Sequence, residues 1–126
     1  MEFVNLYIQS EYSLLHSTVK LNNDFASRLI KDQATSCAIV DNDSMYGAIK
    51  FYNLCKVHNI KPIIGLKLSL KSNYSYNNQV LLYAMNYDGY VNLMKLSTIR
   101  KSSKSDLNID ALYKYRSGVL AIFTSR

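Results

Sequence analysis

The chain lacks the short motifs that mark several common enzyme classes. It contains no glycine-rich phosphate loop, no Ser-His-Asp order and no Cys-x-x-Cys pair. The sequence therefore gives no support to phosphate cradling by a P-loop, to triad hydrolysis or to dithiol chemistry. No apolar run approaches the ~20 residues that cross a bilayer, so we expect no membrane partner.

Cysteine is scarce, with only Cys37 and Cys55 in the chain. Cys37 falls in an apolar run that predicts a core strand, and Cys55 falls on the apolar face of a predicted helix. We expect both to be buried thiols of a reduced, cytosolic protein, not a disulfide or a metal pair.

Positive charge is in excess and is unevenly distributed. The net charge is +6, and residues 95–126 carry seven basic and two acidic side chains. Such a segment can be an electrostatic footprint for nucleic acid, with Arg100, Lys101 and Lys104 as candidate contacts. The alternative is a solvated face on which lysine maintains solubility. No aromatic-interleaved or Gly/Arg-rich run favours the nucleic-acid interpretation.

The segment 37–70 predicts a strand, a helix and a second strand. The apolar run Cys37–Val40 fits a strand that is buried on both faces. Asp43 or Ser44 is a candidate N-cap for a helix over 45–58, whose apolar residues fall at 45, 48, 49, 52 and 55.

The second strand of this unit is predicted to run parallel to the first. Asn59 is a candidate left-handed cap, and the strand begins at Lys61. Two strands joined by a helix form a right-handed parallel unit, in which ligands collect at the carboxyl ends of the strands. Asp41 and Lys67 are expected at those ends.

A strand is predicted over residues 3–9, where side chains alternate strictly. We expect Val4, Leu6 and Ile8 to meet the covering helices. The other side chains, expected in a barrel interior near its mouth, are Asn5, Tyr7 and Gln9. Polar residues on an inward face are unusual for a simple core, so these either line a wet site or bond to one another.

Two further helices are predicted from their caps and apolar stripes. Asn22 caps the first, and Asn86 or Asp88 caps the second. The stripes at helical spacing are Phe25, Ala26, Leu29 and Ile30 in the first helix and Tyr90, Leu93, Met94 and Ser97 in the second. A basic loop is predicted over 100–108, followed by a short helix over 109–115.

Two more strands complete the predicted fold. Loop 71–78 is shorter than the dozen residues of a parallel crossover, so we expect strand 79–85 to be antiparallel to the one before it. The run 118–123 is apolar on both faces and no covering helix follows it. We therefore expect a piece of a longer chain, with an exposed edge at Gly118–Phe123 that self-associates.

Five segments carry a resemblance along essentially the whole chain. They are FVNLYIQSEYSLL at 3–15, MYGAIKFYNLCK at 45–56, NIKPIIG at 59–65, YDGYVNLMKLS at 87–97 and the strand at 118–123. In this order and spacing they resemble the start of the alpha subunit of bacterial DNA polymerase III, which is a polymerase-and-histidinol-phosphatase (PHP) domain.

The resemblance implies an α/β fold that is about half of a PHP-type β/α barrel, mostly parallel with one β-hairpin-like insertion. Residues 1–126 would be the N-terminal portion of a single such domain. Polymerase activity, which uses Mg²⁺, would belong to palm, fingers and thumb segments outside this chain. No cofactor is expected within the chain itself.

The chain departs from the metal-binding members of that family. Those members carry His-any-His where this chain has Tyr7 and Gln9, Asp-His where it has Asp41 and Asn42, and Glu where it has Lys67. Phenol and amide groups are poor ligands for zinc or manganese, and an ammonium repels them. We expect these vestigial positions to hold no metal and the chain to have no catalytic residue.

One hypothesis gives the altered positions a structural role. The Lys67 ammonium would replace a metal as the counter-charge of Asp41, with Tyr7 and Gln9 completing a hydrogen-bond network. A separation beyond the ~4 Å range of ion pairs would reject it. The alternative is that Lys67 reaches solvent and Asp41 caps the next helix.

The sequence favours a non-catalytic scaffold portion of a cytoplasmic, replicative DNA polymerase alpha subunit. The resemblance implies as partners the rest of the alpha chain, DNA, and replisome subunits such as the sliding clamp. Two alternatives remain: a metal-dependent phosphoesterase or 3′–5′ exonuclease, and a basic nucleic-acid-binding module.

Overall fold

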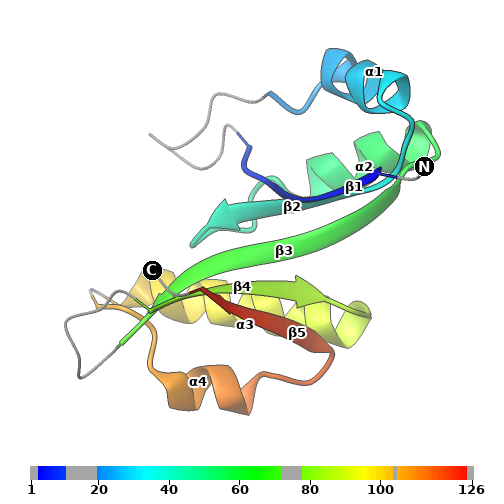
Figure 1. The fold of residues 1–126 in the computed structure, drawn as a ribbon. Helices are drawn as coiled ribbons and strands as arrows, with labels where there is room; N and C mark the ends of the chain where they lie inside the picture. The colour runs from blue at the N-terminus through cyan, green and yellow to red at the C-terminus, as the bar shows by residue number, and fades with distance from the viewer. Residues whose placement is uncertain (1–2, 11–19, 72–77, 104, 125–126) are drawn as a thin grey trace.

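In the computed structural model, which describes residues 3–10, 20–71, 78–103 and 105–124, five strands form one sheet (Figure 1). Their order in the sheet is their order in the chain: β1 (Phe3–Ile8), β2 (Ala34–Asn42), β3 (Lys61–Leu70), β4 (Asn78–Ala84) and β5 (Val119–Thr124).

Of the described strands, β4 alone runs in the reverse direction. β1, β2 and β3 pair in parallel, and β4 is antiparallel to both β3 and β5. The expected mostly parallel sheet with a hairpin-like insertion is confirmed, as is the antiparallel strand inferred from the short loop.

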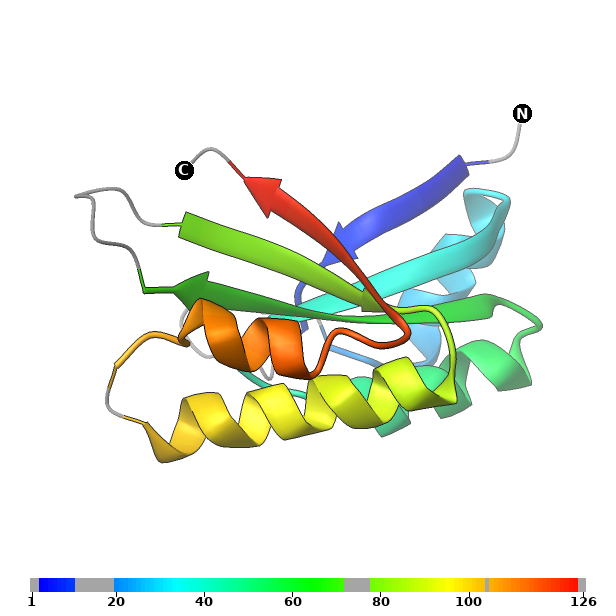
Figure 2. The same cartoon turned by 90° about the horizontal axis from the view of Figure 1, so that it is seen from below.

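Helices cover one face of the sheet, as Figure 2 shows. They are α1 (Asn23–Lys31), α2 (Ala48–Val57), α3 (Tyr87–Ser102) and α4 (Ile109–Lys114). One apolar cluster joins α1 and α2 to β2 and the start of β3, around Phe51 and Ile39. A second joins α3 and α4 to the rest of β3 and to β4, around Leu93 and Leu82. None of the described helices is long and apolar enough to span a membrane.

Asparagine side chains begin three of the described helices. Asn22 Oδ1 accepts from Phe25 N at 3.1 Å, and Asn86 Oδ1 accepts from Gly89 N at 2.9 Å. These two caps were predicted, and Asn108 caps α4 in the same way. The left-handed residue at Asn59 is also confirmed, with φ of 58°.

The predicted start of α2 is wrong. Its N-cap is Gly47, which makes no side-chain cap bond. β2 runs two residues past Val40, and Asp43, with φ of 54°, donates its N–H to Lys67 O at 2.9 Å. Asp43 and Ser44 therefore belong to the turn that ends the strand and not to the helix.

Several predicted apolar stripes are rotated relative to the core. In α2, Phe51 is fully buried, whereas Ile49 is 65% exposed. The other predicted stripe residues that are exposed are Ile30, Tyr52 and Met94. α3 also continues to Ser102, so the loop predicted from residue 100 is helical at its start.

The strict alternation predicted for β1 is also wrong. The register with β2 shifts between Asn5 and Ile8, which pair with Cys37 and Ile39 on the helix-covered side. Asn5 Oδ1 accepts from Tyr7 N at 3.0 Å across this irregularity. Leu6, on this edge strand, is 49% exposed.

The two cysteines lie in the first apolar cluster as buried, free thiols, as predicted. Burial raises the pKa of Cys37 to about 12, with the neighbouring Cys55 adding to the shift. Burial alone raises the pKa of Cys55 to about 11. Neither thiol has the low pKa of a nucleophile.

Two glycines allow the start of α3 to pack against the turn before β5. A Cβ on Gly89 would lie 1.9 Å from Gly118 O, and Gly118 has φ of +72°. Gly118 O also accepts from Met85 N at 2.8 Å. The contact of the two backbones thus fixes where β5 joins the sheet.

Gly89→Ala should lower the free energy of unfolding by at least about 2 kcal/mol. In a helix interior, alanine is more favourable than glycine by up to about 1 kcal/mol of helix propensity. At position 89, however, the methyl group has no room. The measurement is urea denaturation. The control is Ser27→Ala at an exposed position of α1, whose stability we expect to lie within about 0.5 kcal/mol of the wild type. Equal stability of the two variants would contradict the packing argument.

Candidate functional site

The sheet is curled, and the uncovered face lies on the inside of the curl. Tyr83 Oη on β4 donates to Leu6 O on β1 at 2.6 Å. The two strands are three places apart, which is about 14 Å in a flat sheet, further than a tyrosine side chain reaches. The bond therefore requires the barrel-like curvature that the sequence predicted.

Gly65 allows close packing on the inner face beside Tyr83. It lies in register between Val40 on β2 and Tyr83 on β4. A Cβ here would lie 2.9 Å from Val40 Cγ2 and 3.0 Å from Leu82 O. The bare backbone of β3 thus leaves space for the Val40 side chain, which packs with Tyr83 on the inner face.

Four polar side chains gather at the carboxyl ends of β1, β2 and β3. We call Tyr7, Gln9, Asn42 and Lys67 the mouth cluster. Lys67 Nζ donates to Tyr7 Oη at 2.9 Å. Gln9 Nε2 donates to Tyr7 Oη at 3.1 Å and to Asn42 Oδ1 at 3.2 Å. The expected contacts among Lys67, Tyr7 and Gln9 are present, but Asp41 takes no part in them. Asn42, which is in register with Lys67, takes part instead through Gln9.

Asp41 does not belong to the mouth cluster. It is in register with Leu66, one residue before Lys67, and so faces the opposite side of the sheet. It is only 3% exposed. Its two carboxylate oxygens accept from Ser10 N at 2.6 Å and Ser10 Oγ at 2.5 Å.

Both predictions for Asp41 are therefore wrong. Among the ion pairs between described residues, none joins Asp41 to Lys67. Asp41 does not cap α2 either, since that helix begins after Gly47. Instead, Asp41 fixes the chain where it leaves β1, through Ser10, a residue for which the sequence had suggested no role.

The mouth cluster does not fit a divalent metal. Its groups are a phenol, two amides and an ammonium, and the ammonium already donates to the phenol. Neutral amides and phenols are weak ligands for transition metals, and a cation repels them. Across the residues that the structure describes, no group of three or more His, Cys, Asp or Glu side chains is placed to hold a metal ion.

The predicted nucleic-acid contacts are engaged within the chain. Arg100 pairs with Asp43 at 3.5 Å and with Asp106 at 3.9 Å. Lys101 Nζ lies 3.2 Å from the centre of the Tyr46 ring. These contacts hold the loop after β2 on the end of α3, so the geometry gives no support to phosphate contacts by Arg100 and Lys101. Lys104 lies outside the described residues.

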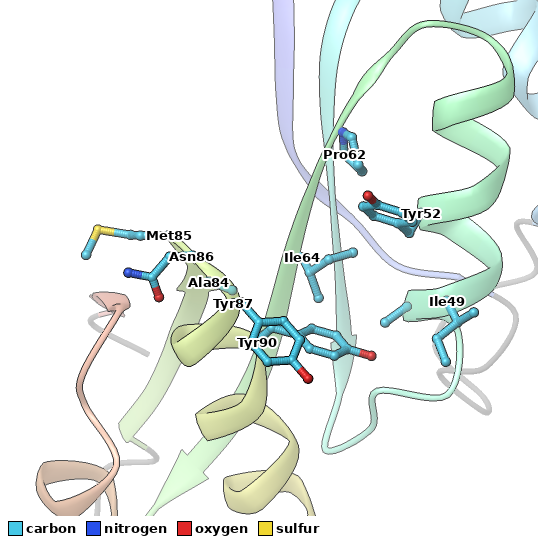
Figure 3. A pocket seen from close by; sticks show the side chains of 10 residues that line it. Ile49, Tyr52, Pro62, Ile64, Ala84, Met85, Asn86, Tyr87 and Tyr90 are labelled. Atoms are coloured by element: carbon cyan, nitrogen blue, oxygen red, sulfur yellow. The ribbon is translucent and has the colours of Figure 1, made fainter.

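A separate apolar groove of about 540 Å³ opens on the helix-covered side (Figure 3). Ile49 and Tyr52 of α2 line one wall, and Tyr87 and Tyr90 of α3 lie opposite them. Ile49 and Tyr52 were predicted to be core residues. They border the groove because α2 and α3 do not close over the first half of β3.

The curled sheet with helices on its outer face defines a part of a β/α barrel, with a polar mouth at the strand ends. Comparison with known proteins identifies it. The family model described as "PHP domain" matches residues 5–125, and the chain belongs to this family.

Among relatives, DNA polymerase III subunit alpha of Bacillus subtilis is 39% identical over 125 residues, which is 97% of this chain and 11% of that protein. The same subunit of Ureaplasma parvum is 41% identical over 103 residues, covering 81% of this chain and 10% of that protein. The chain thus spans about a tenth of the length of these curated relatives.

Solved structures share the fold. An amidohydrolase from Chromobacterium violaceum, with bound SO₄ and no metal, superimposes with a TM-score of 0.58 at 14% identity. The match covers 79% of this chain and 34% of that protein. At this identity the similarity concerns the fold alone.

Tyr83→Phe should lower the free energy of unfolding by about 1 kcal/mol, because the Leu6 carbonyl loses its donor. Burial, with a contribution from Tyr7, raises the pKa of Tyr83 above its ordinary value of 10.0. The stability that depends on the neutral phenol is complete below pH 10 and is lost as the pH rises through the raised pKa. Wild-type stability should therefore fall more steeply above pH 10 than that of the variant.

The measurement is urea denaturation from pH 8 to pH 11. Tyr113→Phe on α4 is the matched control, because that side chain is 66% exposed. It should leave both stability and pH slope unchanged. Parallel pH profiles for wild type and Tyr83→Phe would contradict the role given to the buried phenol.

Proposed function

We propose that residues 1–126 are the N-terminal portion of a PHP domain at the start of a replicative DNA polymerase of the polymerase III alpha type. The similarity to polymerase alpha subunits, 39% identity over 97% of the chain in one case, supports this. The role proposed for the portion itself is structural, without catalysis.

The mouth cluster is the observation that carries the non-catalytic role. Metal-dependent phosphoester cleavage needs a bound cation that activates water and polarises the phosphoryl group. Here the Lys67 ammonium bonds to the Tyr7 hydroxyl, and the Asp41 carboxylate is turned away to Ser10. The phosphoesterase or exonuclease alternative therefore has support from the fold alone.

For the longer chain we propose template-directed DNA synthesis in the cytoplasm, with Mg²⁺ bound by segments outside residues 1–126. Its partners would be DNA and replisome subunits such as the sliding clamp. Sequence similarity to the polymerase subunits supports this, and the described contacts of this chain do not bear on it.

The purified chain should carry no stoichiometric zinc or manganese and should not hydrolyse bis(p-nitrophenyl) phosphate. Elemental analysis and a chromogenic assay measure the two properties. The matched variant Tyr7→His/Gln9→His/Lys67→Glu places two imidazoles and a carboxylate where three side chains already touch. It should gain metal binding. Metal bound to the wild type, with hydrolysis that a chelator abolishes, would overturn the proposal.

We also propose that the chain alone self-associates through β5. β5 is the outermost strand, as expected for the edge at Gly118–Phe123, and its backbone groups on one side have no partner among the described strands. Leu120, Ile122 and Phe123 are 51%, 42% and 61% exposed. An uncharged, apolar edge of this kind is a template for pairing with a second copy.

Light scattering should show a mass that rises with protein concentration. Ile122→Lys should return the chain towards the monomer, because a lysine on an edge strand opposes pairing. The matched control is Leu6→Lys on the other edge strand, where Leu6 is 49% exposed. This variant should self-associate as the wild type does. A monomeric mass at high concentration would refute self-association.

A further inference from the structure

We propose that the mouth cluster binds a phosphate-type oxyanion without a metal, through Lys67 Nζ and the Tyr7 hydroxyl. This inference rests on the proposed non-catalytic function and deepens it. The site would hold a phosphate group without cleaving any bond.

The hydrogen bonds within the cluster fix the direction in which Tyr7 donates. Tyr7 Oη accepts from Lys67 Nζ at 2.9 Å and from Gln9 Nε2 at 3.1 Å. A phenol has one O–H donor and two lone pairs. Because both lone pairs are engaged, the hydroxyl hydrogen remains to be donated to an acceptor.

Gln9 is oriented by the same geometry. Its amide nitrogen donates both to Tyr7 Oη and to Asn42 Oδ1, at 3.1 and 3.2 Å. Only the nitrogen of an amide has two hydrogens to give. Gln9 therefore donates to the Tyr7 oxygen and does not accept its hydrogen. The Tyr7 hydroxyl hydrogen is left for a ligand at the mouth.

Lys67 supplies the charge. An ammonium has three donors, and one of them points to Tyr7 Oη. No carboxylate of the described residues lies within ion-pair distance of Lys67, whereas Arg100 is paired with Asp43 and Asp106. The half-buried ammonium thus provides positive charge at the carboxyl ends of parallel strands, where ligands collect.

These donors suit an oxyanion of phosphate type. Lys67 Nζ has two further N–H donors and Tyr7 Oη has its O–H, and the two atoms are 2.9 Å apart, so one phosphate can receive bonds from both. Tyr7 is 42% exposed, which leaves the mouth open to a ligand from solvent. With one cation in a partly solvated site, we expect an affinity on the order of millimolar.

The test is an ¹H–¹⁵N NMR titration of the whole chain with inorganic phosphate, at constant ionic strength and in the presence of EDTA. The amides of Asn42 and Lys67 should shift and saturate. Lys67→Met should weaken binding at least about tenfold, and Tyr7→Phe by about three- to tenfold.

Lys61→Met is the matched control, because it removes the same charge from an exposed position at the other end of β3. It should leave the affinity unchanged. Three results would each overturn the inference: no saturable shift in the wild type, equal weakening by Lys61→Met, or full binding by Tyr7→Phe.

Two sources of phosphate are separated by competition. A 5′-phosphorylated single-stranded oligonucleotide is compared with the same strand lacking the phosphate. Displacement by both strands assigns the site to the nucleic-acid backbone, and displacement by the phosphorylated strand alone assigns it to a terminal phosphate. If neither strand displaces inorganic phosphate, the site takes the free ion.

Failure of this inference is distinguishable from failure of the proposed function. If phosphate shifts appear only without EDTA and the chain contains metal, the non-catalytic assignment is wrong. If the chain contains no metal and phosphate produces no shift, only the oxyanion site is wrong. Saturation in EDTA supports both.

Discussion

The hydrogen bond from Tyr83 to the Leu6 carbonyl depends on, and maintains, the curl of the sheet. Gly65 lies on the inner face between Val40 and Tyr83, where an added Cβ would meet the Val40 side chain. In a flat sheet, β1 and β3 would lie about 10 Å apart. The curl turns the ends of these strands towards a common mouth, and the contact between Lys67 on β3 and Tyr7 on β1 follows from that shape.

Features that depend on a few neighbouring residues were predictable from the sequence. The Asn22 and Asn86 caps follow from one short side chain meeting the free N–H groups of a helix. The reversal of β4 follows from a loop too short to cross the sheet. The apolar run at 118–123 likewise forms the edge strand β5. In each case the local constraint is stronger than the tertiary alternatives.

Features that depend on register or rotation were not predictable in the same way. The position of Asp41 was known, but one residue of register decides whether a side chain faces the mouth or the helices. Seven of the ten residues of α2 are apolar, so its stripe could be drawn through Ile49 although Phe51 is the residue that packs. The basic residue Arg100 pairs with Asp43, which is distant in sequence and close only after folding.

The polar side chains at the mouth form a mutually satisfied set. A polar or charged group left without a partner at a partly buried position would be costly. Here the phenol, the amides and the ammonium satisfy one another, and the Asp41 carboxylate is bonded to Ser10 on the other face. The cluster therefore holds a positive centre, the Lys67 ammonium, at the mouth of the sheet. That charge is the basis of the oxyanion site that we propose.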